Sequence, residues 1–113
     1  MPAYAVGLFR TKELHADMVE YLERLQATLD PFGGTFLVHG GEVESHEGDW
    51  DRDVVIIEFP GMDEARDWYN SKAYQEILPL RTRHIEGDAF VVQGVGEGYH
   101  PQQKADFFRQ KLN

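Results

Sequence analysis

Three side chains in this sequence have the chemistry to act on a small organic molecule: His39, Tyr69 and Arg81. A histidine or a tyrosine can serve as a general base in proton transfer. A guanidinium can stabilise a developing enolate or phenolate through charge-assisted hydrogen bonds. As a catalytic set, they predict cofactor-free proton transfer, isomerisation or oxygenation of an aromatic or carbonyl compound.

Four further residues are candidates for ligand contacts. Trp68 and Tyr74 could form aromatic walls for a flat ligand, and Trp50 lies in a polar stretch where packing over a cavity mouth or across an interface would explain it. Glu58 is expected on the same sheet face as His39, where it could orient the imidazole. Each has a structural alternative: aromatic residues at helical spacing commonly belong to the core, and a histidine–glutamate pair could be a hydrogen-bonded cluster at a dimer seam.

A small basic cluster follows Pro79: Arg81, Arg83 and His84. A guanidinium here could clamp a carboxylate or a phenolate. The alternative is that these cations offset the dipole at a helix C-terminus or pair with surface acids such as Glu86.

The sequence predicts neither a metal site nor a cofactor. His39, Glu42, Glu44 and His46 lie close together, but Gly40-Gly41 disrupts the strand alternation that would align them, and no HxxxH or HExxH spacing is present. There is no cysteine, no GxSxG elbow and no phosphate-binding glycine loop.

The elements that must position these residues can be derived from hydrophobic periodicity. The β-branched run from Val54 to Phe59 is the strongest strand signal, and Pro60-Gly61 separates it from an amphipathic helix that Asp63 could cap. That helix is expected to break or re-cap at Asn70-Ser71, and Pro79 to kink it or end it. We expect strands at residues 3–10, 35–45, 54–59 and 89–95, and helices at 11–29 and 63–78.

This order is βαββαβ, which predicts a ferredoxin-like α+β fold with a four-stranded antiparallel sheet and two helices on one face. Strand parity puts apolar residues on both faces of the sheet. One face is expected to carry Phe9, Phe36, Ile57, Phe90 and Val92, together with Gly7 and Gly94, which would allow a helix to approach closely. The other face is expected to carry Val6, Leu8, Val54, Ile56 and Val91, together with His39, Glu58 and Gln93. Two helices cannot cover both faces. A second copy is therefore expected on the open face, as a twofold homodimer.

The chain is expected to divide into a domain at residues 1–96 and an extension at 97–113. Pro101 can begin a short helix, which carries Phe107 and Phe108. A helix of about 12 residues is marginal alone. It is therefore expected either to cap its own core or to reach a partner subunit or a pocket.

The 113 residues carry a net charge of −9, without a basic stripe, which argues against nucleic acid as a partner. No apolar run is long enough to span a membrane, and no signal-peptide pattern or cysteine argues for export. A cytoplasmic location is the resulting expectation.

Three segments together resemble a known family: GGTFLVHGGEVE, RDVVIIEFPGMDEARDWYNSKAYQEILPLRTRH and FVVQGV, within residues 3–95. The sequence looks like the domain-of-unknown-function family numbered 1330. The resemblance implies a dimeric α+β barrel, a superfamily that includes cofactor-free monooxygenases, isomerases and haem enzymes. The family commonly has arginine before the Gly-Gly pair, where this chain has His39, a weaker anion partner.

The function expected from these observations is binding of a small organic molecule by a homodimer, with cofactor-free isomerase or monooxygenase-type chemistry as the enzymatic version. A non-catalytic binding or accessory protein is the alternative. A purely structural dimer, whose apolar faces are all used in packing, is the third.

Overall fold

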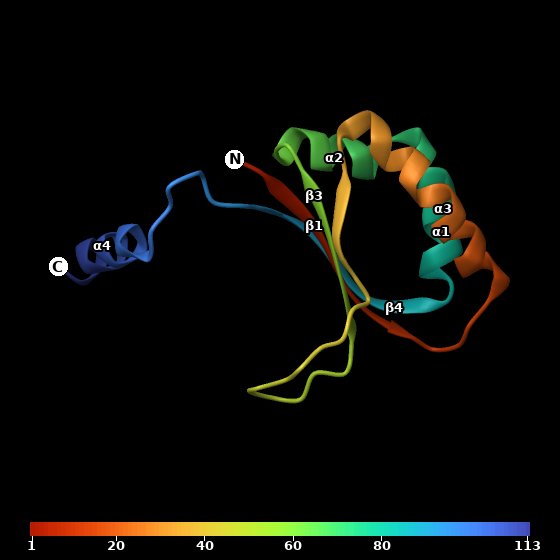
Figure 1. Ribbon diagram of the computed structural model, residues 1–113, viewed down its shortest axis with the longest axis horizontal. Helices are drawn as coiled ribbons and strands as arrows, with labels where there is room; N and C mark the ends of the chain where they lie inside the picture. Colours follow the sequence, from red (N-terminus) through yellow and green to blue (C-terminus); the bar gives the residue numbers. More distant parts are fainter.

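The computed structural model describes residues 1–113 as a four-stranded antiparallel sheet in the order β2-β3-β1-β4, with α1, α2 and α3 on one face (Figure 1). The expected βαββαβ fold is confirmed. None of the helices combines the length and the apolar composition that a membrane span requires. The elements are β1 (Ala3–Thr11), α1 (Ala16–Leu29), η1 (Asp30–Phe32), β2 (Thr35–His39), β3 (Asp53–Phe59), α2 (Met62–Asn70), α3 (Lys72–Thr82), β4 (Ile85–Gln93) and α4 (Pro101–Leu112).

The passage from β3 into the helices follows the expected order, with one shift at the cap. Gly61, rather than Asp63, is the N-cap of α2, and Asp63 lies in the first turn, where its charge suits the helix dipole. The expected break at Asn70-Ser71 is confirmed: Ser71 caps α3, its Oγ accepting the Tyr74 N–H at 3.2 Å. Helix α3 continues through Pro79 to Thr82, so the proline does not end it.

The first helix begins later than expected. We expected Thr11 to cap it, but β1 extends to Thr11 and α1 begins at Ala16. His15 is the N-cap, with its Nδ1 accepting the Asp17 N–H at 3.0 Å. An imidazole nitrogen here accepts the hydrogen bond that a serine or aspartate oxygen usually accepts at an N-cap. Histidine is not among the preferred cap residues, so the sequence did not predict this start of the helix.

The second strand is shorter than expected and contains a bulge. It ends at His39, and residues 40–52 form a connecting loop instead of continuing the strand to residue 45. Phe36 pairs with Ile57 but Val38 pairs with Ile56, so an extra residue enters between them and His39 pairs with Val55. The expected parity of His39 is therefore wrong: the bulge turns it to the helix-covered face, away from Glu58.

The expected faces of the last strand are also wrong. It begins at Ile85 rather than residue 89, and its register pairs Val91 with Ala5 and Phe90 with Val6. Val91 therefore lies on the helix-covered face with Gln93, whereas Phe90 and Val92 lie on the open face, 47% and 44% exposed. Alternation within a strand is readable from sequence, but its phase relative to its neighbours depends on pairing.

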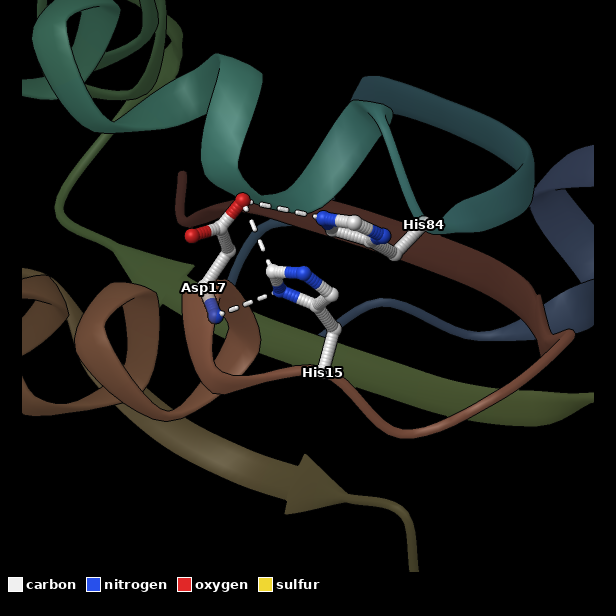
Figure 2. A group of neighbouring side chains, drawn as sticks. All are labelled: His15, Asp17 and His84. Atoms are coloured by element: carbon white, nitrogen blue, oxygen red, sulfur yellow. Dashed lines mark hydrogen bonds and ion pairs between the residues drawn. The ribbon is translucent and has the colours of Figure 1, made fainter.

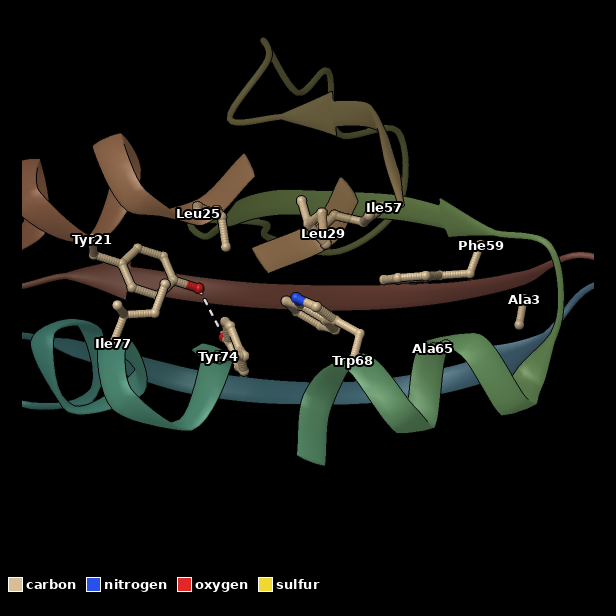
Figure 3. Packing of buried hydrophobic residues seen from close by; sticks show 10 residues of the cluster. All are labelled: Ala3, Tyr21, Leu25, Leu29, Ile57, Phe59, Ala65, Trp68, Tyr74 and Ile77. Carbon is tan, nitrogen blue, oxygen red and sulfur yellow. Dashed lines mark hydrogen bonds between the residues drawn. The ribbon is translucent and has the colours of Figure 1, made fainter. Parts of the chain in front are cut away.

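The core lies between the sheet and the helices and is rich in aromatic rings (Figure 3). Trp68 is central: its Nε1 donates to Thr28 Oγ1 at 3.0 Å, which ties α2 to α1. A buried indole N–H needs such a partner. The cluster comprises Ala3, Tyr21, Leu25, Leu29, Ile57, Phe59, Ala65, Trp68, Tyr74 and Ile77.

The C-terminal extension forms the expected helix, with Pro101 at its first turn. Figure 1 shows α4 projecting away from the sheet at the end of the link that follows β4. All of its residues, including Phe107 and Phe108, are exposed. The expectation that the helix caps its own core is therefore not met, and its apolar side is free for another surface.

We predict that Gly87→Ala strongly destabilises the fold, by about 3 kcal/mol or more. Gly87 lies inside β4 with φ +140°, and a Cβ there would overlap the Leu8 carbonyl oxygen of β1. Gly87-Asp88, where a turn was expected, instead pairs with β1 inside β4. Urea unfolding measures the change in free energy.

Gly48→Ala is the matched control, because Gly48 also has a positive φ (77°) but a Cβ there would meet nothing within 4 Å. Gly48→Ala should therefore lower the free energy of unfolding only by the local backbone strain that alanine introduces, about 1 kcal/mol. Equal losses for the two variants would contradict the pairing of β4 against Leu8.

Candidate functional site

A cavity of about 550 Å³ lies between the helices and the covered face of the sheet. Helices α1 and α3 run side by side (Figure 1). Both contribute residues to the lining of the cavity. Its walls are mostly apolar, and they draw on β1, β2, β3, β4, α1, α2 and α3. Pockets with apolar walls and a few polar groups are typical of small-molecule sites.

Arg81 is the buried charged residue of this cavity, whereas Asp53 and Arg66, which also line it, are exposed. It projects from the last turn of α3 and is only 7% exposed. Its guanidinium lies 4.5 Å from the centre of the Phe9 ring and 5.9 Å from that of Tyr21. It forms no salt bridge, and its buried Nε has no hydrogen-bond partner. Buried cations are ordinarily paired, so this one stands out.

The ring beneath Arg81 is placed by a glycine. Phe9 and Gly7 lie two residues apart on the same face of β1, and a Cβ at Gly7 would overlap the Phe9 ring. Gly7 therefore makes room for the ring to fold back along its own strand. The expectation that Gly7 and Gly94 admit a close helix approach is wrong, because side chains of β1 cover both: Phe9 over Gly7, and Tyr4 over Gly94.

Two tyrosine hydroxyls face each other beside Arg81. Tyr21 Oη and Tyr74 Oη are 2.8 Å apart, and both residues are buried (Figure 3). Burial, together with the neighbouring Tyr74, raises the pKa of Tyr21 far above its usual value. The Tyr21 phenol therefore stays protonated at any physiological pH and can act only as a neutral hydrogen-bonding group.

The charge of Arg81 is maintained in this setting. Burial lowers its pKa, but the phenolic oxygens of Tyr74 and Tyr21 more than offset this, so the pKa lies above its usual value. The group is a permanent cation. The cavity thus offers one buried positive charge and two phenolic hydroxyls among mostly apolar walls.

Five of the seven predicted site residues line the cavity: His39, Trp68, Tyr69, Tyr74 and Arg81. His39 reaches it only because of the bulge in β2, and its ring stacks on Phe36 at 4.5 Å. Trp68 and Tyr74 serve both as core and as cavity wall, whereas Tyr69 is partly exposed. Their catalytic and ligand-binding roles remain predictions.

The structure does not bring Trp50 and Glu58 to the cavity. Trp50 lies exposed in the loop of residues 40–52. Glu58 pairs with Tyr4 and Thr35 on the open face of the sheet, opposite to the face of His39. The expected His39–Glu58 pair is therefore not formed.

Sequence reasoning missed Tyr21, whose hydroxyl meets that of Tyr74. Its spacing carried the signal: Tyr21 is three residues after Met18 and four before Leu25, so it shares their helix face. It also missed His15 and Asp17, which meet His84 outside the cavity and offer nitrogen and oxygen atoms that could hold a metal ion. The basic cluster after Pro79 is thus divided, with Arg81 in the cavity and His84 against α1.

Three solved structures share this fold. RPA0582, a protein of unknown function from Rhodopseudomonas palustris, superposes with a TM-score of 0.67 at 16% identity, over 84% of this chain and 83% of its own. SnoaB, a cofactor-independent oxygenase from Streptomyces nogalater, superposes with a TM-score of 0.58 at 11% identity, over 88% of this chain and 98% of its own. A dimeric ferredoxin-like protein of unknown function from Thermobifida fusca superposes with a TM-score of 0.55 at 17% identity, over 85% of this chain and 92% of its own. At such identities the likeness shows the fold alone.

No curated protein sequence is significantly similar to this chain. A family model does match, over residues 2–95, which include every strand of the sheet and every residue that lines the cavity. Helix α4 lies beyond the match. The chain belongs to the domain-of-unknown-function family DUF1330.

Proposed function

We propose that this protein binds a small aromatic organic anion in its cavity, with Arg81 as the anchor for a carboxylate or phenolate. The observation that carries the proposal is the buried guanidinium of Arg81, which has an unpartnered Nε and no acidic partner. Burying an unpaired charge costs several kcal/mol or forces the group to neutralise, and arginine does not neutralise. An anionic ligand supplies the missing counter-charge.

The walls favour an aromatic ligand. Phe9, Trp68 and Tyr69 present rings to the cavity, and its volume of about 550 Å³ lies within the usual range of about 300–1,000 Å³ for small-molecule pockets. The hydroxyls of Tyr21 and Tyr74 share one hydrogen bond, which uses one of their two protons. The other proton is free to donate to an oxygen of the ligand.

Cofactor-free catalysis is the second candidate function. A guanidinium and a phenolic hydroxyl in one buried cavity are groups that stabilise an enolate or phenolate oxygen. His39 or Tyr69, both in the cavity wall, would remove the proton. An isomerisation needs no co-reactant, whereas an oxygenation consumes O₂, so oxygen uptake distinguishes the two. The fold shared with the cofactor-independent oxygenase SnoaB is an analogy in support.

The assembly we propose is a homodimer through the open face of the sheet. That face carries Val6, Leu8, Val54, Ile56, Phe90 and Val92, and no helix of the same chain covers it (Figure 1). An apolar surface of this extent needs a cover. The dimeric Thermobifida fusca protein, which has this fold, supports the proposal.

We predict that benzoate and 2-naphthoate bind more tightly than the matched amides, benzamide and 2-naphthamide. The carboxylate can pair with Arg81, and a hydrogen bond to a charged group contributes about 1.5–3 kcal/mol, or roughly 10- to 100-fold in affinity. Arg81→Met should abolish this preference for the acids. Arg83→Met, on an exposed arginine outside the cavity, is the matched control. Titration calorimetry or ligand-detected NMR measures the affinities of the acids and the amides for each protein. Equal binding of acids and amides to the unchanged protein would contradict the anchor role of Arg81.

Arg81→Met should also leave the free energy of unfolding unchanged or raise it by about 1 kcal/mol. Methionine keeps much of the buried stem but removes a desolvated charge that has no acidic partner. Urea unfolding of the ligand-free protein measures the change. A loss of more than about 2 kcal/mol would mean that Arg81 is a structural residue.

A dimer should show a mass of about 26 kDa in light scattering, twice the 13.0 kDa of one chain. Ile56→Lys places a charge on the middle of the open face and should give a folded monomer. Val19→Lys, on an exposed position of α1, should remain dimeric. A mass of 13 kDa for the unchanged protein at micromolar concentration would refute the dimer.

A further inference from the structure

Outside the cavity, His15, Asp17 and His84 come together from two distant parts of the chain (Figure 2). His15 precedes α1, Asp17 lies in its first turn, and His84 joins α3 to β4. His84 Nε2 lies 3.0 Å from Asp17 Oδ2, and His15 Nδ1 lies 3.6 Å from the same oxygen. One donor atom of each residue lies within 4.8 Å of those of the other two.

The geometry points to a metal site: we propose that His15, Asp17 and His84 bind one divalent first-row transition-metal ion, such as Zn²⁺. Imidazole nitrogen and carboxylate oxygen bind Zn²⁺ at about 2.0–2.2 Å, which places the ligand atoms of a tetrahedral ion roughly 3.4 Å apart. The separations of 3.0 and 3.6 Å from Asp17 Oδ2 lie on either side of that value. Water would fill the remaining position.

Binding requires one movement of a side chain. The two imidazole rings are stacked, with centroids 3.9 Å apart and planes 14° apart, so one ion cannot lie in the plane of both. His15 is the ring free to turn, because its side chain is 46% exposed whereas that of His84 is 16% exposed. Turning it gives up the stack, and because Nδ1 has a single lone pair, binding an ion through this atom also gives up the N-cap bond to the Asp17 N–H.

Two positive groups oppose the ion. The guanidinium of Arg83 acts on Asp17, and the N-terminus of α1 carries the positive end of a helix dipole. The two imidazole nitrogens of the donor set favour an ion that bonds strongly to nitrogen, as Zn²⁺, Ni²⁺ and Cu²⁺ do, over Ca²⁺ or Mg²⁺, which prefer sites built from oxygens.

The site would join two walls of the cavity at one end. Asp17 lies one helical turn before Tyr21, and His84 lies three residues after Arg81. An ion held by both segments would fix the start of α1 to the α3–β4 connection. Because an ion bound only by the folded state stabilises that state, its effect can be read from unfolding alone.

The test is a calorimetric titration of the full chain with ZnCl₂, supported by thermal unfolding with and without the ion. We expect one ion per chain, with an unfolding temperature raised by about 10 °C at a hundredfold excess over Kd. His15→Ser removes the imidazole but keeps a preferred N-cap residue, and His84→Gln removes the second nitrogen. Each should weaken binding by at least the roughly 10- to 100-fold that loss of an outer-shell partner costs.

His46→Ala is the matched control, because His46 also lies beside a carboxylate, with 2.6 Å between its Nε2 and Glu44 Oε2, in the loop of residues 40–52. It should bind Zn²⁺ as the unchanged protein does. If the unchanged chain binds no Zn²⁺, or if His15→Ser and His84→Gln bind it equally well, the site is overturned and the cluster is an ion pair that holds α1. Loss of binding in His46→Ala instead would place the ion in the loop.

Discussion

The positive charge of Arg81, buried without a counter-charge, is the constraint around which this structure is arranged. The guanidinium lies over the Phe9 ring, which Gly7 accommodates, and beside the joined hydroxyls of Tyr21 and Tyr74. These groups make the charge tolerable, since rings attract cations and phenols are polar, but none neutralises it. A fold selected for stability alone would gain by replacing such a charge with an apolar side chain. Its position is therefore the basis for the ligand that we propose.

The layers of the fold could be derived from sequence because each element carries its own period. The β-branched run of β3, the leucine spacing of α1 and the Ser71 cap are local signals, and the antiparallel sheet follows from their order. For β2 and β4, however, local signals could not show which face of the sheet each side chain lies on. A bulge in β2 turned His39 to the covered face, and the register of β4 did the same for Val91. Both depend on contacts with neighbouring strands that no local pattern records.

The site was partly predictable for the same reason. Aromatic residues after β3 and an arginine at the end of α3 lie on elements whose positions were well predicted, so Trp68, Tyr74 and Arg81 reach the cavity. Tyr21 and the cluster of His15, Asp17 and His84 arise where α1 meets α3 and the connection into β4. Such meetings join residues more than fifty positions apart, and their details are set by how two helices pack. A single sequence contains no direct signal for them.

The loop between β2 and β3 affects how a ligand would enter. It begins at Gly40, next to His39 in the cavity wall, and it is mostly exposed and acidic, with Glu42, Glu44, Glu47, Asp49 and Asp51. An anion that entered past this loop would meet the negative field before it met the cation inside. Added salt screens the exposed carboxylates more than the buried guanidinium, so ionic strength should speed the association of anions while changing their dissociation little. The loop would thereby act as a kinetic filter that admits anions slowly and favours those with enough aromatic surface to stay.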